Sequence, residues 1–210
     1  RLNARVTGLS VQDGRVAGVT LAGGSNVPCA AAVICTGGAS YPSTGSTGDG
    51  WTWLRACGHT VLPALPSLVG LESPAQWARA LTGLSLKNVR LTLSRGKKRL
   101  YSVLGEMLFT HFGVSGPLVL SASAHMRDFS QHKYRLSIDL KPALDREKLE
   151  ARILRDLGEN PNRDFEKILA GLVPHSMVPV ILERLEIPAG LKANSVTKAQ
   201  RRALEELLKG

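Results

Sequence analysis

The sequence predicts a mixed fold of class α+β or α/β, and three observations support this. Runs that alternate apolar and polar residues, as strands do, dominate the first two thirds of the 210 residues. From residue 145 onward, apolar residues recur at the three- to four-residue spacing of helices. Between them, a glycine-rich loop follows an apolar run at residues 33–50, where a strand is expected to lead into a helix.

The first residues predict a β-meander that leads into a central strand. Residues 5–11 and 15–21 alternate, and Asp13-Gly14 between them is a strong hairpin signal. A second turn is expected at 23–25 and a third strand at 27–34. Because this strand ends in continuous apolar residues, we expect it to be buried on both faces, with Cys35 as a small core residue.

A short helix and an irregular segment follow the glycine-rich loop. Asp49 is expected to cap a helix at 50–57, and Gly58 to end it. Residues 59–61 begin another strand by their pattern. Prolines and apolar residues at 62–74 then mark a boundary, which divides the chain into residues 1–62 and 63–210.

The second part is predicted to be β-rich over 63–142 and helical over 143–210. Strands are expected at 86–94, 99–104, 106–110 and 134–140, with a turn at 113–117 and a helix at 117–126. Helices are expected at 145–158, 164–172 and 176–185. Thr197 and Gln200 form a capping box that opens a last helix ending at Lys209.

The composition excludes some classes of protein and leaves one alternative open. Three cysteines without CxxC spacing argue against a disulfide framework or a zinc site and favour a reducing, cytoplasmic location. No apolar run is long enough for a membrane span, and the first residues do not form a signal peptide. Because the chain starts without Met, opens directly on a strand-like pattern and stops after a helix-like one, we expect it to be an excised fragment.

The net charge of +10 at pH 7 suggests a nucleic-acid partner, which the distribution of the charge does not support. The basic residues occur in small clusters at 97–99 and 198–202, and aromatic residues make up only 5%. A solvated basic surface is therefore favoured, and nucleic acid is not the expected partner. A basic nucleic-acid-binding or RNA-modification-associated module remains the alternative.

Two runs carry candidate functional residues. Gly37, Gly38 and the loop at 47–50 would let a ligand approach the backbone, although their spacing matches neither GxGxxG nor a Walker A loop, and a tight loop of small residues is the other reading. In the run 105–117, Thr110 and His111 are the weak catalytic candidates. His111 could exchange a proton near neutral pH or could simply bond to the backbone.

These two runs resemble the BaiN-like or YhiN-like family of FAD-dependent flavoproteins, described as aminoacetone-oxidase-type or NAD(P)/FAD-dependent oxidoreductases. The matching segments are TGGxSYPxTGSTGDG at 36–50, Gly58-His59, LPSLV at 65–69 and GExLFTHxGxSGP at 105–117. The resemblance implies a FAD domain interrupted by an insertion that is part β-barrel-like and part helical. Residues 1–62 would be the central portion of the split FAD domain, and 63–210 the insertion.

The resemblance also implies a site and its limits. Cofactor contacts would come from Val6, Thr36, Gly37, Gly38, Tyr41, Gly48 and Asp49, and Thr110, His111 and Ser115 would face the cleft. The full-length bacterial protein would bind FAD, use NAD(P)H and act on a small-molecule substrate. Since the N-terminal and C-terminal FAD-domain segments lie outside this chain, the fragment should hold no flavin and be inactive. A third possibility is that the apolar segment 62–71 serves dimerisation or substrate capping.

Overall fold

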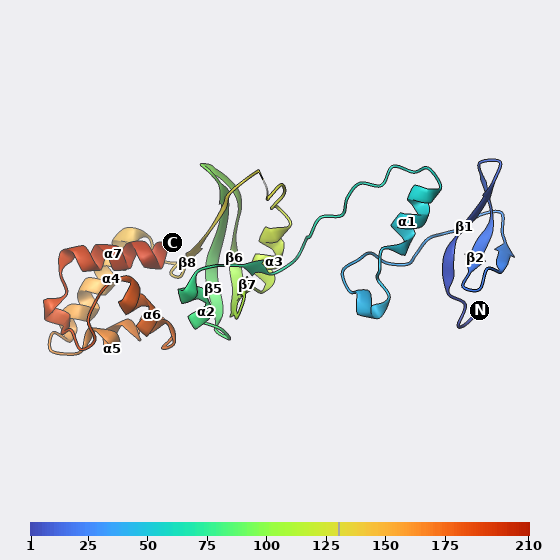
Figure 1. The fold of residues 1–210 in the computed structure, drawn as a ribbon. Coiled ribbons are helices and arrows are strands. Elements are labelled where there is room, and N and C mark those ends of the chain that lie inside the picture. The colour runs from blue at the N-terminus through green and yellow to red at the C-terminus, as the bar shows by residue number, and fades with distance from the viewer. Residues whose placement is uncertain (130) are drawn as a thin grey trace. The chain divides into compact units, whose positions relative to one another are not determined.

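A computed structural model gives the fold of residues 1–129 and 131–210, which divide into two units, Arg1–Ala64 and Leu65–Gly210 (Figure 1). The mixed α+β class predicted from the sequence is confirmed. The strands lie mainly before residue 140 and the longer helices after it. Each unit is described by itself below.

The first unit begins with the predicted meander. Strands β1 (Val6–Gln12), β2 (Arg15–Leu21) and β3 (Asn26–Pro28) form an antiparallel sheet in that order. Asp13 and Gly14 both adopt positive φ, 50° and 73°, as a two-residue hairpin loop requires. A 3₁₀ turn, η1 (Pro42–Thr44), and helix α1 (Asp49–Ala56), which packs against β1, follow.

The predicted central strand is largely absent from this unit. β3 ends at Pro28, and residues 29–34 have no strand structure. Val33 is 89% exposed, and Cys35 is exposed rather than part of a core, so both predictions are wrong here. The physical reason is the lack of partners: a strand needs hydrogen-bonded neighbours, and among the described residues no strand pairs with 29–34.

Two smaller predictions in this unit also need correction. Gly48, with φ 77°, occupies the position before α1, and Asp49 is the first helical residue rather than its cap. The Asp49 carboxylate still lies at the positive end of the helix dipole. Residues 59–61 form no strand, because no described strand lies beside them to accept their hydrogen bonds. Gly58 follows the helix with φ 87°, as predicted.

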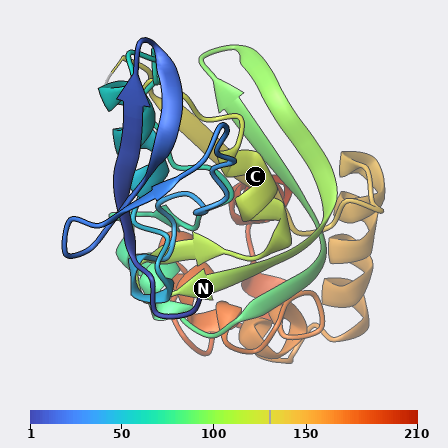
Figure 2. The same ribbon diagram turned by 90° about the vertical axis from the view of Figure 1, so that its right-hand side faces the viewer.

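The second unit contains a five-stranded antiparallel sheet in the order β4-β7-β6-β5-β8. Its strands are β4 (Leu71–Glu72), β5 (Ser85–Arg95), β6 (Lys98–Thr110), β7 (Gly113–Ser115) and β8 (Tyr134–Asp139). The long strands β5 and β6 bend along their length, so the sheet curls into a half-barrel (Figure 2). Helices α2 (Gln76–Ala80) and α3 (Pro117–Ser123) pack against β6.

A single long strand, β6, replaces two predicted ones, because Gly105 does not interrupt it. A Cβ at Gly105 would lie 3.0 Å from the side chain of Leu118 on α3. The glycine therefore lets the helix approach the strand closely rather than forming a turn. The predicted turn at 113–117 also contains a short strand, β7, and α3 ends at Ser123 instead of Met126.

The last third is helical, as predicted. It contains α4 (Arg146–Glu159), α5 (Phe165–Leu169), α6 (Met177–Arg184), the 3₁₀ turn η2 (Ala193–Ser195) and α7 (Lys198–Lys209). The Asp145 side chain accepts a hydrogen bond from the Lys148 amide at the start of α4, and the capping box of Thr197 and Gln200 is present. These caps satisfy amides that a helix leaves free.

The sheet and the helices of the second unit share one hydrophobic core. It includes Leu91 and Leu93 of β5, Phe109 of β6, and Leu149 and Leu204 of the helices, each at most 1% exposed. Every buried hydrophobic side chain among the described residues belongs to this unit. The first unit therefore has no buried apolar core of its own.

Candidate functional site

The glycine-rich loop of the first unit folds back on itself before α1. The Tyr41 carbonyl accepts hydrogen bonds from the Thr44 amide (3.0 Å) and hydroxyl (2.8 Å). The Gly48 amide donates to the Gly38 carbonyl at 2.9 Å, which closes the loop. Gly37, Gly45 and Gly48 adopt positive φ, so glycine is needed for this backbone path.

Gly50 sets how closely α1 can approach the residues that lead into the loop. A Cβ at this position would lie 2.8 Å from both Ile34 Cγ2 and Thr36 Oγ1. No side chain fits there, so the first turn of α1 packs directly against 34–36. A helix start held against a chain segment that ends in glycines is the arrangement in which proteins hold anionic cofactors.

The seven residues expected to contact a cofactor differ in how accessible they are to a ligand. Thr36, Gly37 and Tyr41 are exposed, and Asp49 begins α1. Gly38 and Gly48 bond to each other, and Gly48 lies 3.2 Å from the Trp51 ring, measured to an added Cβ. Of the seven, Val6 alone, half-buried at the start of β1, comes from outside the loop and helix.

Tested against this geometry, the loop fits one wall of a cofactor site. Thr36 and Gly37 are exposed residues, and the position at Gly50 admits no side chain. The amide of Gly48 is already used within the loop, so its contribution would be to shape the loop and not to bind. Thr36, Gly37, Tyr41 and the first turn of α1 are thus the residues that could touch a cofactor.

In the run 105–117 of the second unit, close packing requires glycine at two positions. A Cβ on Gly113 would lie 2.3 Å from the Leu71 carbonyl oxygen, and one on Gly116 would lie 3.0 Å from the Met107 backbone. The Thr110 hydroxyl accepts a hydrogen bond from the Gly113 amide at 3.2 Å and so stabilises the turn. These residues hold β4, β6 and β7 together.

His111 lies in the turn between β6 and β7. It is exposed, and its ring meets the edge of Phe112 with 5.1 Å between centroids. Ser115 is half-buried on β7. Thr110, His111 and Ser115 lie outside the large pocket of their unit, and their role in a cleft stays a prediction.

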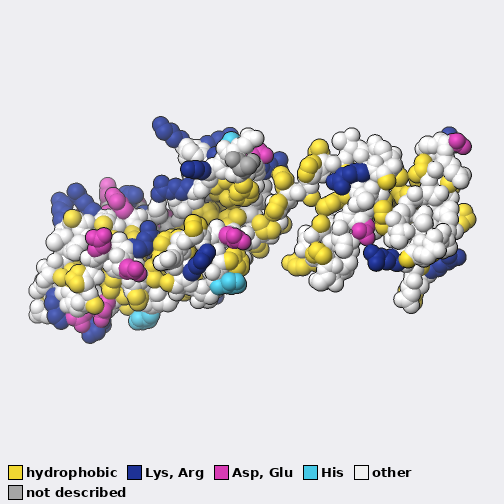
Figure 3. Space-filling view, viewed as in Figure 1, with side chains coloured by type: hydrophobic (Ala, Val, Ile, Leu, Met, Phe, Trp, Pro, Cys, Tyr) yellow, Lys and Arg dark blue, Asp and Glu magenta, His cyan; other side chains and the backbone are white. Residues whose placement is uncertain are grey.

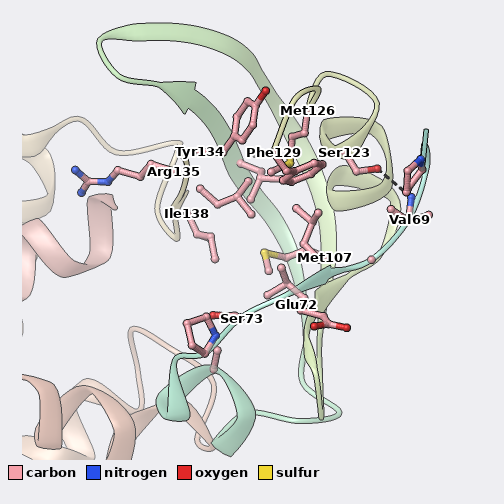
Figure 4. A pocket seen from close by; sticks show the side chains of 18 of the residues that line it. Val69, Glu72, Ser73, Met107, Ser123, Met126, Phe129, Tyr134, Arg135 and Ile138 are labelled. Carbon is pink, nitrogen blue, oxygen red and sulfur yellow. Dashed lines mark hydrogen bonds between the residues drawn. The ribbon is translucent and has the colours of Figure 1, made fainter. Parts of the chain in front are cut away.

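That pocket, which sequence reasoning did not anticipate, lies on the inner side of the curled sheet and has a volume of about 710 Å³ (Figure 4). Its walls are mainly apolar and include Met107, Met126, Phe129, Tyr134 and Ile138. The alternation of β5, β6 and β8 predicts an apolar inner face, whereas a hollow depends on how far the sheet curls. Such concave apolar sites are suited to small molecules.

Two hydroxyl groups fix the rim of this pocket. Ser123, 2% exposed, accepts a hydrogen bond from the Val69 amide at 2.9 Å and donates to the Leu120 carbonyl (Figure 4). The Tyr134 hydroxyl bonds to the backbone of Arg127. Because both hydroxyls are occupied, they shape the pocket, and the apolar side chains form its binding surface.

Two ionisable groups of the second unit, Asp164 and Lys141, have lowered pKa values. Hydrogen bonds from Lys192 and Lys167 lower the pKa of Asp164 to about 2. Burial, and then the charge of Arg152, lower the pKa of Lys141. Asp164 joins α5 to the chain before η2, so its shifted pKa reflects a structural ion pair.

Positive charge is concentrated in residues 65–141, the barrel part of the second unit, which contains the curled sheet. Residues 65–141 contain eleven Lys and Arg against four Asp and Glu, a net charge of +7, whereas 142–210 have a net charge of +1. Lys and Arg side chains gather at the tip of the β5–β6 hairpin (Figure 3).

In the described part of the chain, no helix is long and apolar enough to cross a membrane.

Comparison with known proteins identifies the second unit. The sequence profile described as "HI0933-like protein barrel and H2TH domain" matches residues 65–210, the whole of that unit. A 3-dehydro-bile acid delta(4,6)-reductase of Clostridium scindens is 26% identical over 184 residues, which cover 87% of this chain and 45% of the reductase.

Two further relatives are ribosomal RNA dihydrouridine synthases. That of Haemophilus influenzae is 32% identical, with 74% of this chain and 36% of the enzyme covered. That of Escherichia coli is 32% identical, with 79% of this chain and 39% of the enzyme covered. The chain thus spans less than half the length of the curated relatives it matches.

Proposed function

Because the chain belongs to the HI0933-like family, through its barrel and H2TH domain, we propose that the full-length protein is a flavoprotein oxidoreductase that binds FAD and draws electrons from NAD(P)H. The finer resemblance to the BaiN-like or YhiN-like branch is part of this proposal. The observation that carries it is the exposure of Thr36 and Gly37 beside the start of α1, where Gly50 admits no side chain.

The exposed apolar residues of the first unit support a larger FAD domain. Val33 is 89% exposed, Leu2 is 94% exposed, and no apolar side chain of the unit is buried. Apolar side chains at that density of exposure are normally covered by neighbouring structure. We infer that residues 29–35 become the predicted central strand when other segments of the full-length protein pair with them.

The relatives' names suggest the reaction class. One is a reductase of double bonds in a bile acid, and two make dihydrouridine, the product of reducing a double bond in uridine. We propose that this protein likewise reduces a carbon–carbon double bond conjugated to a carbonyl group. When bound, the flavin would supply a hydride to the β carbon, and a proton taken ultimately from solvent would add to the α carbon, while the chain would orient the substrate.

In this proposal each unit has a separate task. Thr36, Gly37, Tyr41 and the first turn of α1, beginning at Asp49, would hold the cofactor. The barrel, with its apolar pocket and basic surface, would recognise the substrate. This chain alone would be inactive, since it contributes one wall of the cofactor site.

The test is the visible absorption spectrum of the full-length protein, as purified and after incubation with FAD. A flavin spectrum that NADH or NADPH bleaches supports the proposal, and a protein that stays colourless with added FAD refutes it. Gly50→Ala should reduce retained FAD at least about tenfold, because the new Cβ would collide with Ile34 and Thr36. Gly8→Ala is the matched control, since no atom lies within 4 Å of its added Cβ. Equal FAD retention by the two variants would refute the assignment of the loop.

A further inference from the structure

We propose that the outer face of the β5–β6 hairpin binds the phosphate backbone of RNA, so that RNA is the substrate class of the proposed reductase. This outer hairpin face comprises Arg90, Thr92 and Ser94 of β5 and Arg99 and Ser102 of β6. The inference rests on the proposed function for its catalytic meaning. The binding itself can be measured without a flavin.

Strand geometry brings these polar side chains to one surface. Leu91 and Leu93 are fully buried, so the alternate residues Arg90, Thr92 and Ser94 point to the opposite face of the sheet. In the β5–β6 register, Ser94 lies opposite Arg99 and Thr92 opposite Ser102. Side chains directly opposite each other share a face, so two arginines flank a row of hydroxyls.

A hollow marks the same surface. Arg90, Arg99, Leu100, Tyr101 and Ser102 line a shallow pocket of about 290 Å³. The hydroxyls of Thr92 and Ser102 lie 3.0 Å apart beside it. Guanidinium and hydroxyl groups are the side chains that most often donate to phosphate oxygens.

The cations of the hairpin have no acidic partners among the described residues. All the ion pairs among the described residues lie between residues 139 and 209, outside the hairpin. At the tip, Arg95 lies directly opposite Lys98, and like charges in that position repel. Unbalanced positive charge of this kind indicates an anionic partner from outside the chain.

The dimensions favour a nucleic acid. The strand rise of about 3.3 Å per residue places Ser94 about 13 Å from Arg90 on the same face, a distance over which one strand of a duplex carries roughly four phosphates. The five residues of the outer hairpin face and the tip at 95–99 are polar or glycine, and Leu104, opposite Arg90 and 50% exposed, is the large apolar side chain beside them, which is too little to anchor in a lipid bilayer. Two of the relatives act on ribosomal RNA by name, which selects RNA among the polyanions.

The test measures binding of a fluorescein-labelled, uridine-containing 20-nucleotide RNA hairpin to the full-length protein as a function of salt. The variant Arg90→Gln/Arg99→Gln should weaken binding roughly tenfold at low salt and reduce the slope of log K against log salt by about 2. The matched control, Lys198→Gln/Arg202→Gln, removes two exposed cations from α7 and should change binding less than about twofold.

Three outcomes would overturn the inference: no RNA binding at low salt, an equal loss in the α7 control, or stronger arginine-dependent binding to phosphatidylserine vesicles than to RNA. Loss in the α7 control alone would assign binding to that helix instead. The absorption spectrum separates this inference from the proposed function. A yellow protein that does not bind RNA refutes only the RNA surface, and a colourless protein that binds RNA through Arg90 and Arg99 refutes only the reductase.

Discussion

Replacing Lys209 with methionine should destabilise the second unit by about 3 kcal/mol. The Lys209 Nζ lies 2.7 Å from Asp139 Oδ2 and donates to the carbonyls of Lys141 (3.1 Å) and Leu144 (2.7 Å). These bonds join the end of α7 to the end of β8, and the two charged side chains are only 14% and 17% exposed.

The magnitude follows from what methionine leaves behind. A hydrogen bond to a charged group contributes about 1.5–3 kcal/mol, and removing one partner of a buried ion pair costs about 3–5 kcal/mol. Residual contact with water places the Lys209 value near the lower end of that range. Methionine keeps the apolar stem, so the loss reports the ammonium group and not a cavity.

Urea unfolding of the 210-residue chain, followed by far-UV circular dichroism, measures this loss. Arg146→Met is the control, because it removes an ion pair with Glu205 in which the arginine is 62% exposed; its loss should stay below about 1 kcal/mol. Adding Asp139→Asn to Lys209→Met should recover at least about 1 kcal/mol, because the unpaired carboxylate is then absent. A Lys209 variant no less stable than the control would refute the reasoning.

Three further predictions concern the helical part. Leu204→Ala should reduce the free energy of unfolding by about 2–5 kcal/mol, since this fully buried side chain leaves a cavity; a urea midpoint within error of the parent would contradict it. Thr197→Ala should cost about 1 kcal/mol by removing the cap of α7, measurable in the same titration, and an unchanged midpoint would argue against the capping box. The pKa of Asp164 is lowered to about 2 by Lys192 and Lys167, so its stabilisation is complete above about pH 4 and is lost as the pH falls from about 4 toward 2. Asp164→Asn should therefore flatten the acid side of a stability–pH profile, and a profile that stays parallel to the parent's would refute the ion pairs.

The sequence predicted well those elements whose signals are local. Asp13-Gly14 defined the first hairpin, and the Thr197–Gln200 box marked the start of α7. The alternation around Leu91 and Leu93 identified β5 and which of its faces is buried. In each case the deciding interaction lies within a few residues of the pattern itself.

Prediction failed where the deciding partner lies far away or outside the described residues. The run at 29–34 has the composition of a buried strand, yet Val33 is exposed because no described strand pairs with it. The large pocket of the barrel part also left no sequence signal, since Met107 and Tyr134 meet there only through the curl of the sheet. Strand existence and pocket shape are both set by tertiary contacts.

Glycine motifs show most clearly why the chemistry could not be assigned from spacing alone. Gly50 and Gly113 both sit in conspicuous glycine-rich runs, and at both an added Cβ would collide with neighbouring atoms, at 2.8 Å and 2.3 Å. At Gly113 the collision is with the backbone of the adjacent strand β4, so the glycine serves sheet pairing inside a complete core. At Gly50 the close approach instead brings a helix start to the exposed residues Thr36 and Gly37, in a unit with no buried apolar core. Only the second environment leaves room for a ligand, so Gly50→Ala should lose FAD while its control on β1, Gly8→Ala, retains it.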